Sequence, residues 1–170
     1  GFIDYNKSLN KNILLSMVDS LSHRGPDDKG VEVFDIKQAV IGFGQTRLSI
    51  IDLSEHGHQP MKYDSLVLTY NGEVYNFKAI KKELIQLGYS FFSDSDTEVI
   101  LKSFHAWRER CVEKFIGMFA FAIFDSKVHK VYFFRDRVGI KPLYIAQQND
   151  VTLFSSEVKS FLQVDAFQQE

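Results

Sequence analysis

The sequence predicts an α+β domain in which packed β-sheets form the interior and helices lie outside. Between Phe119 and Phe124, bulky and small side chains alternate without any polar residue, which is typical of a strand buried on both faces. Between Phe77 and Leu87, by contrast, apolar residues recur at the spacing of an amphipathic helix. The chain also contains 16 phenylalanines, which is enough for a thick core between layers.

The first third of the chain is expected to hold a strand, a helix and then paired strands. Phe2 and Ile3 are apolar and uncapped, so Gly1 to Asp4 should belong to a strand. A helix should follow Ser8, because apolar residues lie at helical spacing from Ile13 to Leu21, and it should run out at His23-Arg24-Gly25-Pro26. Further strands are expected at residues 31–34, 39–43 and 45–51.

The rest of the chain alternates between strands and helices. A strand leads into Asn71, and the helix at residues 77–87 is closed by Gly88, a common residue just beyond a helix C-terminus. Ser95-Asp96-Thr97-Glu98 matches the S/T-x-x-E capping box, so Asp96 should lie at the N-terminus of a helix that continues to Trp107. Strands are expected at 119–124, 131–134 and 151–154, and a final helix after Ser155-Ser156-Glu157. Without a repeat or linker, residues 1–170 should form a single domain.

Composition and charge argue against several classes of function. A net charge of −2 and a pI near 6.2 do not fit a nucleic-acid surface, which would show clustered Lys and Arg. The longest apolar run, residues 115–124, is interrupted by Gly117 and is shorter than the about 20 residues that a membrane span needs. The start of the chain has no leader-like pattern and Cys111 is the single cysteine, so a reducing, cytoplasmic setting is expected.

The segment from Val67 to Asn76 carries the clearest local signal, because an apolar run is interrupted there by Asn71-Gly72. One interpretation is a hairpin turn, since both residues tolerate positive φ. The other is an oxyanion hole at the end of a strand, since the side-chain amide of Asn71 and the unshielded backbone N–H of Gly72 are adjacent hydrogen-bond donors. The two residues alone leave both interpretations open.

Two smaller features have mainly structural interpretations. His56 and His58 lack a third ligand at a plausible spacing, so no metal site is expected. The segment Arg24-Gly25-Pro26-Asp27 is typical of a turn with proline near its start.

Seven motifs occur in the order in which one family carries them. They are His23-Arg24-Gly25-Pro26-Asp27, Arg47-Leu48-Ser49-Ile50-Ile51-Asp52, Gly57-His58-Gln59-Pro60-Met61, Asn71-Gly72-Glu73-Val74-Tyr75-Asn76, Ser95-Asp96-Thr97-Glu98, Gly117-Met118-Phe119-Ala120-Phe121 and Arg135-Asp136-Arg137-Val138-Gly139-Ile140-Lys141-Pro142-Leu143-Tyr144. In this combination the chain resembles the glutaminase domain of glutamine-dependent asparagine synthetases, which are class II amidotransferases with an N-terminal-nucleophile fold. The resemblance implies a four-layer αββα sandwich of two antiparallel sheets between helical layers.

The resemblance also implies a mechanism. In the family, the thiolate of an N-terminal Cys attacks the side-chain amide of glutamine, its own α-amino group acts as the base, and a glutamyl thioester and ammonia are formed. Asn71 and Gly72 would form the oxyanion hole. Gly1-Phe2 align with the end of the family's opening Cys-Gly-Ile-x-Gly-Phe, so the nucleophile is expected just upstream of residue 1. Cys111 has no α-amino base beside it and is expected to be a structural thiol.

The substrate-binding residues follow from the same motifs. Arg47 would bind the α-carboxylate of glutamine in the bidentate geometry that a guanidinium favours. Asp96, together with Glu73, would hold the α-ammonium group, and backbone groups around Leu48 and Ile50 would complete the pocket. A free amino acid needs one fixed cation and one or two fixed anions for recognition, and these motifs supply both kinds of charge.

The implied partners are glutamine and, in the full-length protein, a synthetase domain that activates aspartate with ATP and Mg²⁺. The domain itself is expected to need no cofactor, and the chain contains no ATP-pyrophosphatase motif of the Ser-Gly-Gly-x-Asp-Ser kind. Residues 1–170 alone should therefore be inactive without the Cys and unable to make asparagine. Arg135-Asp136-Arg137 is either a surface ion cluster or a segment facing the synthetase domain. The chain could also form a homodimer.

Two alternative functions stay open at this point. One is a catalytically silent module of the same fold that binds glutamine or another protein. The other is an amidotransferase that acts on a different acceptor, such as a sugar.

Overall fold

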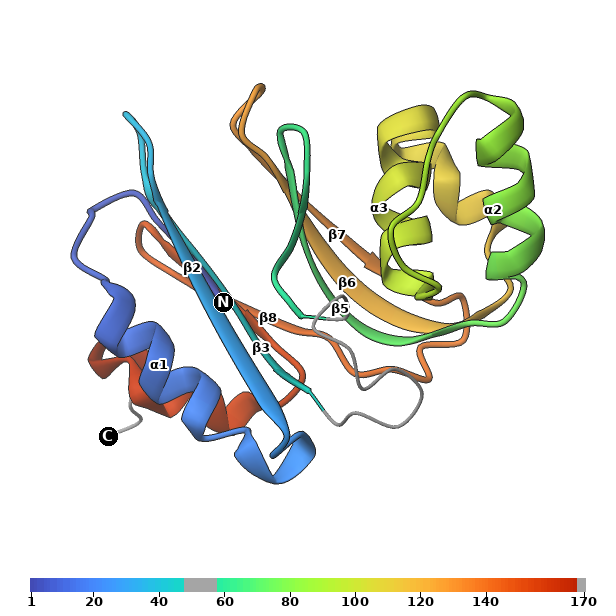
Figure 1. Cartoon of the computed structure of the whole chain (residues 1–170). Coiled ribbons are helices and arrows are strands. Elements are labelled where there is room, and N and C mark those ends of the chain that lie inside the picture. The colour runs from blue at the N-terminus through green and yellow to red at the C-terminus, as the bar shows by residue number, and fades with distance from the viewer. Residues whose placement is uncertain (48–57, 168–170) are drawn as a thin grey trace. The chain divides into compact units, whose positions relative to one another are not determined.

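The computed structural model describes residues 1–47 and 58–167, with only the backbone of Ala166. These residues divide into two compact units. The first comprises residues 1–47, 58–60 and 142–167, and the second comprises residues 61–141. Each unit contains an antiparallel sheet with helices packed on it, and each is described by itself (Figure 1).

The sheet of the first unit has the strand order β2-β3-β1-β9-β8, with antiparallel neighbours throughout. Its strands are β1 (Phe2–Asp4), β2 (Asp28–Asp35), β3 (Val40–Arg47), β8 (Tyr144–Gln148) and β9 (Val151–Ser155). The short strand β1 lies between β3 and β9, so the start of the chain is held by ladders on both sides.

One α-helix and several 3₁₀-helices accompany this sheet. Helix α1 (Lys11–Asp19) begins where the side chain of Asn10 accepts hydrogen bonds from the backbone N–H groups of Asn12 and Ile13. Its buried residues Leu14 and Met17 join Phe2, Leu153 and neighbouring apolar side chains in one core cluster. The 3₁₀-helices are η1 (Ser22–Arg24), η4 (Val158–Gln163) and η5 (Asp165–Phe167), so the expected final helix is a 3₁₀-helix rather than an α-helix.

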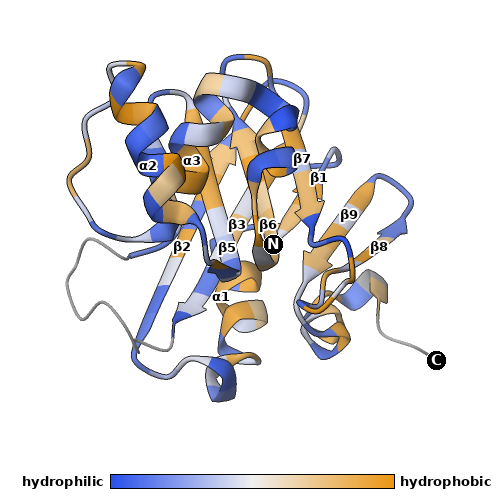
Figure 2. Ribbon diagram, turned by 90° about the vertical axis from the view of Figure 1, so that its right-hand side faces the viewer, coloured by the Kyte–Doolittle hydropathy of each residue, from blue (hydrophilic) through white to orange (hydrophobic). Residues whose placement is uncertain are grey.

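The sheet of the second unit has the strand order β4-β5-β6-β7. Its strands are β4 (Met61–Tyr63), β5 (Leu66–Val74), β6 (Gly117–Asp125) and β7 (Lys130–Arg135). Helices α2 (Phe77–Gln86) and α3 (Asp96–Trp107) cover one face of this sheet, and η3 (Arg108–Lys114) follows α3 (Figure 1). Strand β6 is hydrophobic along most of its length, as Figure 2 shows, and its residues from Phe119 to Asp125 are buried.

The fold class expected from the sequence is confirmed. Among the described residues the strands form two antiparallel sheets with helices beside them, in an α+β arrangement. Strand β8 was not expected, because most of its residues are exposed and no apolar run marks it. None of the helices in the described parts of the chain combines the length and apolarity needed to cross a bilayer.

The capping box at the start of α3 is confirmed in one half and wrong in the other. Ser95 is the N-cap, and its hydroxyl accepts a hydrogen bond from the N–H of Glu98 at 3.4 Å. The side chain of Glu98 does not return to the N–H of Ser95. It accepts hydrogen bonds from the N–H groups of Phe92 and Ser93 instead, because it is buried between Lys102 and the loop that connects α2 to α3.

Two neighbouring residues of α2 test how far burial controls stability in the second unit. Leu84 is fully buried in the core, whereas Ile85 is 52% exposed. Replacing Leu84 with alanine should lower the free energy of unfolding by about 2–5 kcal/mol, because apolar contacts are lost and a cavity is left. Replacing Ile85 with alanine should change it by about 0.5 kcal/mol or less. Urea unfolding of both variants measures the difference, and equal effects would contradict this assignment of the core.

Candidate active site

Asn71 and Gly72 lie within strand β5 and not in a turn. The ladder with β6 is continuous from Leu66 to Val74, and it pairs Asn71 with Ala120 and Gly72 with Phe119. The hairpin interpretation is therefore wrong. A turn at these residues would have reversed the chain, whereas β5 continues through them and stays paired with β6. The expectation that a strand ends at these residues is also wrong, since β5 continues to Val74.

Gly72 occupies a backbone position that a larger residue would not fit. Its φ is +149°, in a region that L side chains rarely adopt. A Cβ atom at this position would lie 2.2 Å from the carbonyl oxygen of Met118 and 2.6 Å from Cα of Phe119.

The side chain of Asn71 carries a donor without an acceptor. Its Nδ2 atom is buried, yet it has no hydrogen-bond partner among the residues that the structure describes. Leaving a buried polar group unpaired costs about 1–3 kcal/mol, so such a group calls for an explanation. A donor held ready for the oxygen of a bound acyl group provides one.

Asp96 is fixed at the first turn of α3 by two hydrogen bonds from β5. Its Oδ2 atom accepts from the hydroxyl of Tyr70 at 2.7 Å and from the N–H of Val74 at 3.0 Å. Val74 directly follows Glu73, so the backbone N–H that binds Asp96 belongs to the residue after the other carboxylate expected to bind an ammonium group. The other oxygen of Asp96, Oδ1, makes no hydrogen bond within the described part of the chain.

Tyr70 is a site residue that sequence reasoning missed. Its ring is buried in the core of the second unit, and burial, together with the negative charge of Asp96, raises the pKa of its hydroxyl. The hydroxyl therefore stays protonated and donates to Asp96. Because side chains alternate along a strand, Asn71 and Glu73 lie on the sheet face opposite to Tyr70. The alternation was readable from the sequence, but the partner of the hydroxyl was not.

Arg47 lies in the first unit, at the end of β3, and the segment after η1 supports its backbone. Pro26 forms a bridge with Arg47, and the N–H of Asp27 donates to the carbonyl oxygen of Arg47 at 3.1 Å. Gly25 packs so closely that a Cβ atom there would lie 2.5 Å from the carbonyl carbon of Arg47. Leu48 and Ile50 lie outside the described residues.

Comparisons with known proteins decide the family. A sequence model described as "Glutamine amidotransferase domain" matches residues 1–170. The chain belongs to this family. It is 40% identical over 168 residues to asparagine synthetase [glutamine-hydrolyzing] 3 of Bacillus subtilis, which covers 95% of the chain and 26% of that protein. It is 41% identical over 152 residues to asparagine synthetase [glutamine-hydrolyzing] 1 of the same organism, covering 88% of the chain and 23% of that protein.

The glutamine amidotransferase domain thus spans about a quarter of the length of these curated relatives. A solved structure supports the fold. Glutamine phosphoribosylpyrophosphate amidotransferase from B. subtilis, complexed with ADP and GMP, matches with a TM-score of 0.80 and 21% sequence identity. The match covers 96% of this chain and 43% of that chain, and at this identity it concerns the fold alone.

Cys111 and His58 of the amidotransferase domain have structural surroundings. Cys111 is fully buried, and burial raises the pKa of its thiol to about 12, so the reactive thiolate is scarce at neutral pH. His58 pairs with Asp28 at 2.8 Å, while His56 lies outside the described residues. Within residues 1–47 and 58–167 no three His, Cys, Asp or Glu side chains cluster as a metal site would require.

Asp136 is not part of a surface ion cluster, so that interpretation is wrong for this residue. It is buried, and its carboxylate accepts hydrogen bonds from the N–H groups of Lys141, Ile140 and Phe119. Burial opposes its ionisation, but these hydrogen bonds outweigh burial and lower the pKa of Asp136 to about 2. Arg135 instead donates to the carbonyl oxygens of Gly139 and Lys141. Both side chains therefore fix the shape of the loop.

Glu157 ties η1 to the segment after β9 in the first unit. Its carboxylate accepts from Arg24 at 3.0 Å and from His23 at 2.9 Å, and Lys159 lies 3.4 Å away. The hydrogen bonds from Arg24 and His23 lower the pKa of Glu157 to about 2. The ion cluster thus holds η1, which directly precedes the segment that supports Arg47.

This shift predicts an acid-dependent contribution to stability. The folded pKa lies below the ordinary value of 4.5, so ionised Glu157 stabilises the fold above that pH and loses its effect as the pH falls toward 2. The loss of urea resistance in Glu157→Gln, relative to wild type, should therefore be largest above pH 4.5 and shrink in acid. Glu109→Gln, at an exposed glutamate, is the control. A difference that does not change with pH would contradict the role of Glu157.

Proposed function

We propose that this domain hydrolyses glutamine to glutamate and ammonia, and that a synthetase domain of the full-length protein uses the ammonia to amidate aspartate. The observation that carries the proposal is the buried Nδ2 of Asn71, which has no hydrogen-bond partner in the described part of the chain and adjoins Gly72 on β5. The relatives support the same reaction, since they are asparagine synthetases of the glutamine-hydrolyzing kind.

The nucleophile in this proposal is the N-terminal cysteine of the family's opening motif, whose last two residues align with Gly1-Phe2. Its sulfur attacks the side-chain carbonyl carbon of glutamine, and the carbonyl oxygen becomes an oxyanion that accepts hydrogen bonds from Asn71 and Gly72. The C–N bond then breaks, ammonia leaves with a proton from the cysteine's α-amino group, and water hydrolyses the thioester to glutamate. The nitrogen of Gly1 lies 2.7 Å from the carbonyl oxygen of Phe154, so the segment that follows this motif is held against β9 from Gly1 on.

Charged residues would recognise the amino-acid end of glutamine. Arg47 binds the α-carboxylate, and its backbone is supported by Pro26 and Asp27. Asp96 and Glu73 bind the α-ammonium group, with the Oδ1 atom of Asp96 as the acceptor that no described residue occupies. Backbone groups around Leu48 and Ile50, which lie outside the described residues, complete the pocket.

The remaining features of the proposal concern the whole protein. Thioester chemistry at this domain uses a thiol, an amine, water and amide donors, so we propose that the domain works without a cofactor and that ATP and Mg²⁺ act in the synthetase domain. The acceptor is aspartate in this proposal, and the synthetase domain determines it. We further propose a cytoplasmic protein that forms homodimers.

The proposal is tested by covalent labelling of the full-length protein expressed from its natural start codon. A diazoketone analogue of glutamine alkylates catalytic thiols, and intact mass followed by peptide mapping locates the adduct. We expect a single adduct on the cysteine that precedes Gly1 and none on Cys111, whose thiol is buried. No adduct, with glutamine still bound, would refute the hydrolase and favour a silent glutamine-binding module.

The oxyanion hole predicts a specific effect of Asn71→Ala in the full-length protein. Because Asn71 donates to charge that develops only in the transition state, kcat for glutamate release should fall about 10²–10³-fold while KM for glutamine changes little. Asn12→Ala, at an exposed position of α1, is the control and should leave both constants unchanged. An unchanged kcat in Asn71→Ala would remove this residue from the hole.

A further inference from the structure

A buried ion pair contacts the loop between α2 and α3, residues 87–95, which directly precedes Asp96. Glu98 and Lys102 are one turn apart on α3, are 1% and 3% exposed, and are joined by a direct contact. The ammonium group of Lys102 also lies 4.5 Å from the ring centroid of Phe91 and 4.9 Å from that of Tyr63. Replacing a buried ion pair by apolar residues is often neutral or stabilising, so stability alone is a weak reason for this one.

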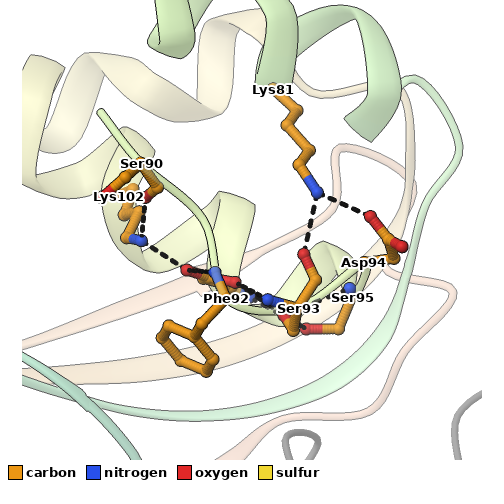
Figure 3. A network of polar contacts seen from close by, with 8 residues as sticks. Lys81, Ser90, Phe92, Ser93, Asp94, Ser95 and Lys102 are labelled. Carbon is orange, nitrogen blue, oxygen red and sulfur yellow. Dashed lines mark hydrogen bonds and ion pairs between the residues drawn. The ribbon is translucent and has the colours of Figure 1, made fainter. Parts of the chain in front are cut away.

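The pair fixes the loop through the loop's backbone. Lys102 donates to the carbonyl oxygen of Ser90 (Figure 3). Glu98 accepts from the N–H groups of Phe92 and Ser93. Several hydrogen bonds to Glu98 lower its pKa although burial opposes its ionisation. The carboxylate therefore stays charged and serves as a fixed acceptor below the loop.

Ser93 connects this anchor to the start of α3. Its hydroxyl donates to Glu98 at 2.6 Å, accepts from the N–H of Ser95 at 3.3 Å and lies 3.0 Å from the hydroxyl of Ser95. Ser95 is the N-cap of α3, and Asp96 is the first residue of that helix. The carbonyl oxygen of Ser93 accepts a further hydrogen bond from Lys81 of α2 at 2.8 Å (Figure 3). All polar groups of Ser93 are thus engaged immediately before the predicted ammonium site.

We propose that Ser93, held by the Glu98–Lys102 pair, is a positioning residue that sets the place of Asp96 for the α-ammonium group of glutamine. This inference rests on the proposed function. Strand β5 holds the carboxylate of Asp96 through Tyr70 and Val74, and the Ser93 network holds the backbone of Ser95, the residue directly before Asp96. A carboxylate fixed from both sides binds an ammonium group without a further loss of conformational freedom.

The test uses Ser93→Ala in the full-length protein, with glutamate release from glutamine as the assay. This variant removes the hydroxyl while leaving the ion pair intact. KM for glutamine should rise about fivefold or more, as expected for coupled neighbours, while kcat stays within about twofold of wild type. The matched control is Ser103→Ala on the same helix, since Ser103 is fully buried and its hydroxyl has no hydrogen-bond partner in the described residues. Its KM should not change.

A double-mutant cycle separates positioning from general stability. If Ser93 acts through Asp96, then adding Ser93→Ala to Asp96→Asn should change KM by less than about twofold beyond Asp96→Asn alone. Additive effects, or an unchanged KM in Ser93→Ala, would overturn the positioning role. A wild-type protein that releases no glutamate would instead refute the proposed function itself, so the two failures are distinguishable.

Discussion

The hydrogen-bond ladder between β5 and β6 is the interaction on which the candidate site depends. It runs without a break from Leu66 to Val74, and it passes through Asn71, Gly72 and Glu73. A ladder fixes both the height of each residue along the strand and the face to which its side chain points. A register slip of one residue would therefore exchange the face of Asn71 with that of Tyr70 and disrupt both the donor and the support of Asp96.

The pairing of β5 with β6 also explains how a polar group such as the Asn71 amide can lie in apolar surroundings. Strand β6 brings buried phenylalanines and alanines to the ladder between Phe119 and Phe124, so β5 is held by packing as well as by hydrogen bonds. Within this rigid frame an unpaired amide such as that of Asn71 can persist, because the surrounding structure outweighs its cost. In the first unit the backbone of Arg47 is supported differently, by contacts with Gly25, Pro26 and Asp27.

Sequence patterns predicted the elements that burial dictates and failed where long-range contacts decide. The strand at Phe119–Phe124 and the helix from Phe77 are confirmed, because their apolar patterns reflect a core face directly. The turn interpretation at Asn71-Gly72 is wrong because local propensity contains no information about a partner strand more than forty residues away. That strand, β6, provides the hydrogen-bond ladder. Asp136 and Glu98 were misread for the same reason.

The candidate site was predictable only in part. The motifs identified Asn71, Gly72, Glu73, Asp96 and Arg47 as candidates, and the structure places the first four on β5 and at the adjoining start of α3. The roles of Tyr70 and Ser93 depend on which distant group each hydroxyl meets, and no spacing in the chain encodes that.

The loop after β7 shows how a protein can separate the shape of a segment from its surface chemistry. Asp136 and Arg135 hold residues 136–141 through backbone N–H and carbonyl groups. The side chains of Val138 and Ile140, which are 84% and 59% exposed, take no part in that scaffold. Such a loop can exchange its outward-facing side chains while keeping its path, so new binding specificities can arise there by single substitutions at little cost in folding.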